Sequence, residues 1–232
     1  MNRVTMKQTY PRVSRTINSW VTGWNKLGRQ TQFYGWTIKG VWDAVVHYRA
    51  QVLRLIAQTG LGTGALAIIG GTVVIIGFLT LTAGSTLAAF SYQQLTNVGI
   101  DALMGFTSAF INIRLLAPLI AGIGLVATIG ASATAQLGAM RISEEIDALE
   151  VMGIRTVPYL ASARLVAGLV VVVPLYCIAV LMAILATRTA TTIGYGQSAG
   201  VYDHYFNTFL NPSDLLWSLF QAVVMAFIVM LV

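Results

Sequence analysis

Four long stretches of this sequence contain no charged residue, and they constrain the fold more than any other feature. They cover residues 55–100, 115–140, 165–187 and 215–232. About 20 apolar residues in a helix cross a hydrocarbon layer of about 30 Å, so each stretch can hold a transmembrane helix. Charged residues make up only 9% of the chain and apolar residues 56%, whereas soluble domains carry about 25% charged residues. We therefore expect an all-α polytopic membrane protein.

Positively charged residues are concentrated near the N-terminus. Nine of the 14 Lys and Arg residues precede residue 60, and Asp43 is the only acidic residue among them. Such a bias is typical of the cytoplasmic flank of a membrane protein. We expect a multi-pass protein of the cytoplasmic (inner) membrane whose N-terminus is cytoplasmic, with a basic, mobile tail over residues 1–32. Nucleic-acid binding is not expected, because the cations are scattered and no recognition motif accompanies them.

Residues 33–58 have the spacing of an amphipathic helix. Apolar residues from Ile38 to Ile56 share one face, and polar residues such as Lys39 and Asp43 share the opposite face. This pattern is typical of a helix that lies in the plane of the lipid headgroups. Residues 59–232 then form the transmembrane domain, with spans predicted near 60–83, 112–135, 163–186 and 217–232. The last span stops without a flanking charge, so we expect a C-terminal segment to be missing.

Small residues are concentrated on the predicted first and second spans. Six glycines occur between residues 60 and 77, and in the second span alanines recur every four residues beside a parallel row of small residues. Small side chains allow helices to approach closely in lipid. Helix packing is the simpler interpretation, and direct contact with a substrate is the alternative. The candidate packing, dimer or cavity residues are Gly70, Gly71, Gly77, Ala127, Gly130, Ala131, Thr134, Ala135 and Gly138.

The sequence lacks the motifs of the common enzyme classes. It contains no GxxxxGK[ST] phosphate-binding loop, no HExxH and no GxSxG, so we expect neither catalytic nor metal-binding residues. No acidic residue lies near the middle of a span, although ion-coupled transporters commonly bind their ions at that depth. If the protein moves a substrate, we therefore expect the energy to come from a partner.

Four of the eight acidic residues are found between residues 144 and 150. Ser143 fits an N-cap, the acidic residues favour the positive end of a helix dipole, and Gly153 fits the position that ends a helix. We expect a cytoplasmic helix over about 143–152 that is too short to persist alone. It either folds onto its own bundle or docks onto a soluble partner. The candidate docking residues are Ser143, Glu144, Glu145, Ile146, Asp147, Leu149, Glu150 and Met152.

The run TAQLGAMRISEEIDALEVMGI at residues 134–154 resembles the signature of the MlaE/YrbE permeases of ABC transporters. More narrowly, it is similar to the YrbE subunits encoded with mycobacterial Mce proteins. The similarity covers residues 35–232, through TGALAIIGGTVVIIGF, RLLAP and YGQSAGVYDHYFNTFLNP. It implies a membrane-parallel elbow helix, five transmembrane helices of which four are visible here, and a coupling helix around residues 143–152.

The same resemblance implies partners for this chain. They are a second permease subunit, a dimer of cytoplasmic ABC ATPases, MCE-domain proteins outside the membrane, and a lipid substrate. We expect no cofactor in this chain, with ATP and Mg bound by the partner ATPase. Many family members carry Glu at the positions of Leu115 and Gln136 and Gly-Arg at residues 127–128. The missing charges suggest that this chain is one half of a heterodimer.

Two other functions are alternatives to a lipid-transporting, non-catalytic permease. One is a membrane scaffold that anchors an extracellular MCE assembly without transport. The other is an intramembrane lipid-modifying enzyme, for which only Asp203 and His204 offer a site. Association with an ATPase would separate transport from scaffolding, because a scaffold needs no cytoplasmic docking element.

Overall fold

The computed structural model describes the backbone of residues 11–61 and 71–231, and side chains from residue 23 to 58 and from 71 to 231. This part of the chain is helical and contains no strand, which confirms the predicted all-α fold. The α-helices are α2 (Pro11–His47), α3 (Arg49–Leu61), α5 (Gly71–Val98), α6 (Met104–Thr107), α7 (Ala117–Leu125), α8 (Ala131–Ile142), α9 (Glu145–Val151), α10 (Ala163–Thr189), α11 (Ala199–Phe209) and α12 (Pro212–Leu231). One 3-10 helix, η1 (Asp101–Leu103), and four π-helical segments lie between them. The π-helical segments are η2 (Ser108–Leu116), η3 (Val126–Gly130), η4 (Val157–Ser162) and η5 (Ala190–Gly194).

Among the described residues, four helical rods are long and apolar enough to cross a membrane. They are Gly71–Val98, Asp101–Ile142, Val157–Gly194 and Pro212–Leu231. Each rod includes most or all of one charge-free stretch of the sequence. The protein is therefore a multi-pass membrane protein.

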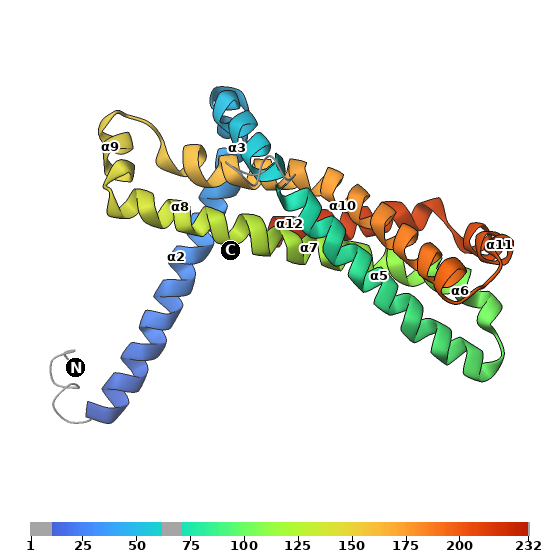
Figure 1. The fold of residues 1–232 in the computed structure, drawn as a ribbon. Coiled ribbons are helices and arrows are strands. Elements are labelled where there is room, and N and C mark those ends of the chain that lie inside the picture. The colour runs from blue at the N-terminus through green and yellow to red at the C-terminus, as the bar shows by residue number, and fades with distance from the viewer. Residues whose placement is uncertain (1–10, 62–70, 232) are drawn as a thin grey trace.

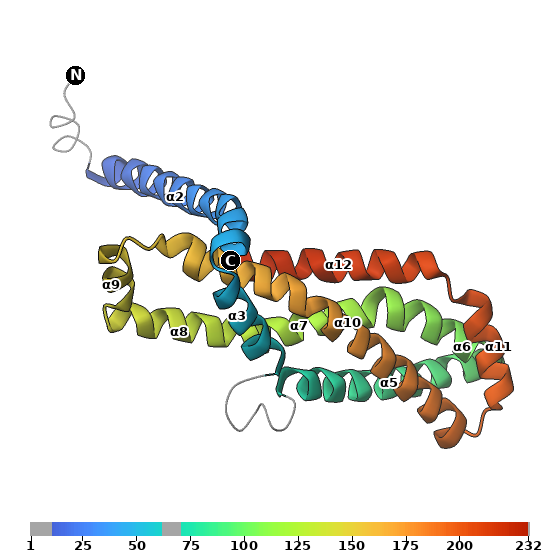
Figure 2. The same ribbon diagram turned by 90° about the horizontal axis from the view of Figure 1, so that it is seen from above.

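The helices α5, α7, α10 and α12 lie side by side in one bundle (Figures 1 and 2). α8 and α9 extend beyond one end of the bundle, and α6 and α11 lie at the opposite end. We call these the α9 end and the α11 end. α2 leaves the bundle at a steep angle, and α3 runs from it towards the bundle (Figure 1).

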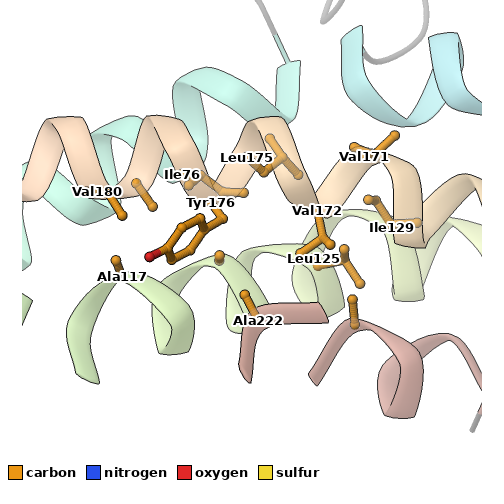
Figure 3. Packing of buried hydrophobic residues seen from close by; sticks show 13 residues of the cluster. Ile76, Ala117, Leu125, Ile129, Val171, Val172, Leu175, Tyr176, Val180 and Ala222 are labelled. Atoms are coloured by element: carbon orange, nitrogen blue, oxygen red, sulfur yellow. The ribbon is translucent and has the colours of Figure 1, made fainter. Parts of the chain in front are cut away.

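The apolar core lies between α10 and its neighbours. Val172 and Tyr176 of α10 form one buried cluster with Ile76 of α5 and Leu125 of α7 (Figure 3). The close approach of α5 and α7 depends on Gly124, where an added Cβ would lie 2.5 Å from the Ile76 side chain. Small residues at such crossings let two backbones approach, which is the usual way in which helices pack in lipid.

The N-terminal helices differ from the predicted tail and single amphipathic helix. α2 begins at Pro11 and ends at His47, and α3 starts after a break at Tyr48. Proline is favourable in the first turn of a helix, because the N–H that it lacks would have no partner there. The polar composition that predicted a mobile tail is thus compatible with helix from residue 11, and two helices replace the one expected over residues 33–58.

The face of α2 that packs on the bundle is made of small residues. Thr37, Gly40 and Ala44 are buried, and the Ser162 hydroxyl at the end of η4 donates a hydrogen bond to the Thr37 carbonyl at 2.7 Å. Trp42, which the spacing placed on the apolar face, stays exposed. Large apolar side chains of α2 such as Trp42 are therefore free to contact the membrane–water interface, where aromatic residues are enriched.

The spans are longer than hydropathy predicted. α5 continues to Val98, well into the connection expected over residues 84–111, and it stops at Gly99, whose φ is +75°. The second span starts at Asp101 rather than near 112, and the third starts at Val157 rather than near 163. A helix ends where its backbone hydrogen bonds end, often at a left-handed glycine. Hydropathy locates only the part of the helix that lies in lipid.

A buried polar network fastens α11 to the bundle. The Asn112 amide donates to the Ser108 hydroxyl at 3.0 Å and to the Thr187 hydroxyl at 2.8 Å. The Tyr202 hydroxyl of α11 donates to the same Ser108 oxygen at 2.6 Å. Burial raises the pKa of Tyr202 to about 12, so its hydroxyl keeps the proton that it donates. Buried polar groups that find partners in this way hold neighbouring helices in one arrangement.

Candidate functional site

The predicted docking segment forms α9, at the tip of the loop between the second and third spans. It lies beyond the bundle, and α8 and η4 carry it on either side (Figures 1 and 2). Neither α8 nor α9 contains a buried residue. This part of the chain therefore presents a surface that its own bundle leaves uncovered.

The beginning of α9 differs from the prediction, because Ser143 is not its N-cap. The Ser143 hydroxyl donates back to the Ala139 carbonyl at 3.0 Å, and the Ser143 N–H bonds the same carbonyl at 2.9 Å. Ser143 thus ends α8. Glu144 occupies the cap position with φ of +59° and makes no capping hydrogen bond, so α9 starts only at Glu145. A serine between two helices can hydrogen-bond to either one, and here its hydroxyl donates to carbonyls at the end of α8.

The end of α9 at Gly153 is confirmed. Gly153 has φ of +77°, its N–H bonds the Glu150 carbonyl at 2.9 Å, and the next N–H, of Ile154, bonds the Leu149 carbonyl at 3.1 Å. These two bonds form a Schellman motif, in which a left-handed glycine satisfies the last carbonyls of a helix. The motif closes α9 and directs the chain back towards the third span.

The four acidic residues of this segment fall into two pairs. Asp147 accepts a hydrogen bond from Arg141 at 3.1 Å, and Glu150 accepts one from the Thr156 hydroxyl at 3.1 Å. These two acids brace α9 against its own flanks. Glu144 and Glu145 are exposed and form no ion pair within the described part of the chain, so their charges are available to a partner.

Apolar side chains lie beside these acidic residues. Ile146 and Leu149 are half-buried, whereas Met152 is 66% exposed. Ile142 and Val151, which we did not predict as part of the site, are 86% and 89% exposed. We call Ile142, Glu144, Glu145, Val151 and Met152 the tip surface. An exposed apolar patch rimmed by charge is typical of a protein–protein contact.

The small residues of the predicted packing faces have two different environments. Gly77 is buried, and an added Cβ would lie 3.8 Å from the Met182 side chain of α10. Gly71 and Ala127 line a cavity between spans. The more distal residues of the second span lie where the chain does not cover them: Ala131, Thr134, Ala135 and Gly138 are exposed and Gly130 is half-buried. Gly70 lies outside the described residues.

The charged residues at the α11 end are paired. Arg188 holds both carboxylate oxygens of Asp203, at 2.9 and 2.8 Å, and this contact lowers the pKa of the Asp203 carboxyl. Arg114 lies 2.6 Å from Asp214. The described residues contain no cluster of three or more His, Cys, Asp or Glu side chains that could hold a metal ion. With Asp203 engaged by Arg188, the pair with His204 gives little support to the enzyme alternative.

Comparison with known sequences decides the family. The profile of the family Permease MlaE matches residues 61–232, which include the whole tip surface. The chain belongs to the MlaE permease family. Permeases of this family are membrane subunits of ABC transporters without a catalytic function of their own.

Relatives of this MlaE-family chain include bacterial proteins named as ABC transporter permeases and a plant protein with a different name. A "Probable ABC transporter permease protein" of Rickettsia bellii is 25% identical over 167 residues, which cover 68% of this chain and 61% of the relative. A protein of the same name from Rickettsia felis gives the same values. "Protein TRIGALACTOSYLDIACYLGLYCEROL 1, chloroplastic" of Arabidopsis thaliana is 27% identical over 159 residues, which cover 66% of this chain and 45% of the relative. The chain spans about three fifths of the length of the rickettsial relatives.

Proposed function

We propose that this chain is a permease subunit of an ABC-type lipid transporter of the Mla/Mce kind, driven by a separate ATPase. The observation that carries the proposal is the tip surface of α9. It combines acidic residues without partners in the described chain and exposed apolar side chains, at one end of a membrane bundle. Such a surface suits a soluble partner.

The charge distribution supports a cytoplasmic position for the α9 end. Arg141 and Arg155 lie on either side of α9, and Arg155 is bonded to Asp43 of α2 at 2.9 Å. This bond joins the α9 end to the basic N-terminal region. By the positive-inside rule these segments belong on the cytoplasmic side of the cytoplasmic membrane, where ATPases operate.

The mechanism that we infer is mechanical. The second span and α8 form one continuous helical rod over Asp101–Ile142, and α9 follows it after a two-residue turn. A partner that holds α9 and changes shape on ATP hydrolysis can therefore move the second span directly. ATP and Mg are bound by that ATPase dimer, and this chain contributes only the helices that transmit the movement.

A lipid substrate and further subunits complete the proposal. One relative is named after trigalactosyldiacylglycerol, which is a glycerolipid. The exposed small residues of α8 offer a flat face to a second permease subunit, and the neutral Leu115 and Gln136 support a different YrbE-type chain in that place. MCE-domain proteins would cover the α11 end outside the membrane. A scaffold without transport would need no tip surface.

The experiment is a charge reversal at the two unpaired acids, Glu144→Lys with Glu145→Lys. Glu150 is left intact, because its reversal would also break the bond to Thr156. We expect about a tenfold or greater loss of ATPase that co-purifies with the permease, at unchanged permease level, since loss of one partner of a buried, hydrogen-bonded charge pair at an interface costs about 2–5 kcal/mol. Asp101→Lys reverses an exposed acid at the opposite end and is the matched control. Unchanged ATPase association and lipid transport in the double variant would contradict the docking role.

A further inference from the structure

A cavity of about 310 Å³ lies inside the α9 end of the bundle. It is formed where α3, α5, the end of the second span, α10 and α12 meet. Its wall is apolar over much of its extent, with Ile75 and Met230 among the lining residues, and Ile75 is partly exposed at the surface of the bundle. The lining also includes the polar residues Gln58, Ser132, Gln136 and Arg164.

Arg164 brings a positive charge to this cavity without a negative one beside it. Its Nη2 donates to the Gln136 amide oxygen at 3.1 Å, and its Nη1 is buried and has no hydrogen-bond partner among the described residues. None of the described residues that line the cavity is acidic. The guanidinium is therefore held in place by a neutral side chain and keeps a free donor.

Arg164 differs in this respect from the other arginines beyond residue 100. Each of these, at positions 114, 141, 155 and 188, forms an ion pair with a carboxylate of the described chain. Arg164 forms none there, although it is less exposed than Arg141 or Arg155. A partly buried charge without a counter-charge is costly, and the cost is removed when an anion binds.

The surrounding polar groups favour an anion at this position. The Ser132 hydroxyl already donates to its own helix, at the Ile129 carbonyl. The donors that can face a ligand include Arg164 Nη1 and the amides of Gln136 and Gln58. A guanidinium with a fixed orientation binds phosphate or carboxylate through parallel hydrogen bonds.

We propose that this cavity binds the anionic headgroup, a phosphate or carboxylate, of a membrane lipid in the leaflet at the α9 end. Arg164 binds the anion, Gln136 orients Arg164 without neutralising it, and the apolar wall at Ile75 receives the first part of an acyl chain. A lipid is favoured over a free anion because the site opens beside apolar surface that faces the membrane. The inference does not depend on the docking role of α9.

The test is lipid binding to the full-length protein after delipidation, measured by native mass spectrometry with phosphatidylglycerol as the probe and phosphatidylcholine as a lipid without net charge. We expect preferential retention of phosphatidylglycerol. Arg164→Gln and Gln136→Glu should each lower its affinity about tenfold, the first by removing the charge and the second by supplying an internal carboxylate. Arg155→Gln removes an equal charge at the same end outside the cavity and should bind like the unmodified protein.

Gln136→Glu keeps the experiment decisive if Arg164→Gln does not fold, because it changes an exposed side chain to one of nearly the same shape. Equal binding of phosphatidylglycerol by both variants and the unmodified protein would overturn the proposal. So would displacement of the lipid by inorganic phosphate, which would assign the site to a free anion. If no lipid is retained and Arg164→Gln instead separates subunits of the complex, the counter-charge is a carboxylate of another chain and the proposal is wrong.

Discussion

The two ends of the helical bundle satisfy their polar side chains in different ways. At the α11 end, Tyr202, Ser108 and Asn112 are fully buried and bonded to one another. At the α9 end, the polar side chains of α8 and α9 are exposed, and their bonds, such as Arg141 with Asp147, lie in solvent. Exposed ion pairs contribute about 0–1 kcal/mol, whereas a buried network also fixes geometry.

The difference shows which part of the molecule is complete by itself. The α11 end has its own small core, in which Ala88, Met104 and Tyr202 are buried. The α9 end has no buried side chain in α8 or α9 and exposes Ile142, Val151 and Met152. We infer that the α11 end keeps its shape during function and that the α9 end takes its final surroundings from other molecules.

The largest expected effect tests the core of the α11 end. Tyr202→Ala should lower the free energy of unfolding by about 3–5 kcal/mol, because it removes a buried aromatic ring and one of the two hydrogen bonds that the Ser108 hydroxyl accepts. Tyr202→Phe isolates the hydroxyl and should cost about 1 kcal/mol. The measurement is denaturant unfolding of the purified protein in detergent. Leu149→Ala, at the half-buried face of α9, is the counterpart and should cost clearly less than Tyr202→Ala; an equal or larger loss would contradict the comparison.

Substitution of one glycine by alanine at each end should change the stability by an intermediate amount and in opposite directions. At Gly105, an added Cβ would lie 2.6 Å from the backbone nitrogen of Phe206 in α11, so Gly105→Ala should destabilise the protein by about 1–3 kcal/mol. At Gly138 in α8, no atom of the described residues outside its own helical turn lies within 4 Å of an added Cβ. Gly138→Ala should therefore stabilise the isolated chain by about 0.5–1 kcal/mol through helix propensity.

Thermal unfolding of the isolated chain distinguishes the two glycine variants. If both variants changed the stability in the same direction, Gly105 and Gly138 would be equally packed, and the proposed difference between the two ends would be wrong. In the assembled complex, the gain from Gly138→Ala should turn into a loss if a second subunit packs on α8.

The smallest expected effect concerns pH at the α11 end. Arg188 lowers the pKa of the Asp203 carboxyl below its usual value of 3.8. A carboxyl whose pKa is depressed on folding contributes stability above its unfolded pKa and loses it as the pH falls through the folded pKa. The difference in melting temperature between the unmodified protein and Asp203→Asn should persist from neutral pH down to about pH 3.8 and shrink at lower pH, as the carboxyl of the folded protein becomes protonated. A difference that does not shrink as the pH falls below 3.8 would show that the ion pair does not stabilise α11.

Sequence patterns predicted the local features of the candidate site with mixed success. The left-handed glycine at 153 was recognisable because few other residues tolerate that conformation. The role of Ser143 was not, since a serine flanked by two helices can bond either of them. The exposure of Ile142 and Val151 was also hidden, because the helical spacing of apolar residues does not reveal which ones lack a packing partner.

The sequence by itself determined that the chain crosses a membrane, since four long apolar stretches without charge in a chain with so few charged residues match membrane-spanning helices. It also determined where the acidic segment interrupts the spans. The tertiary structure decided the ends of the helices, which follow backbone hydrogen bonds rather than hydropathy. It also decided which small residues are packed and which acids are paired. Only the structure shows that Asn112 hydrogen-bonds to Thr187 and Arg164 to Gln136. These contacts join residues far apart in the chain, so no local pattern could have revealed them.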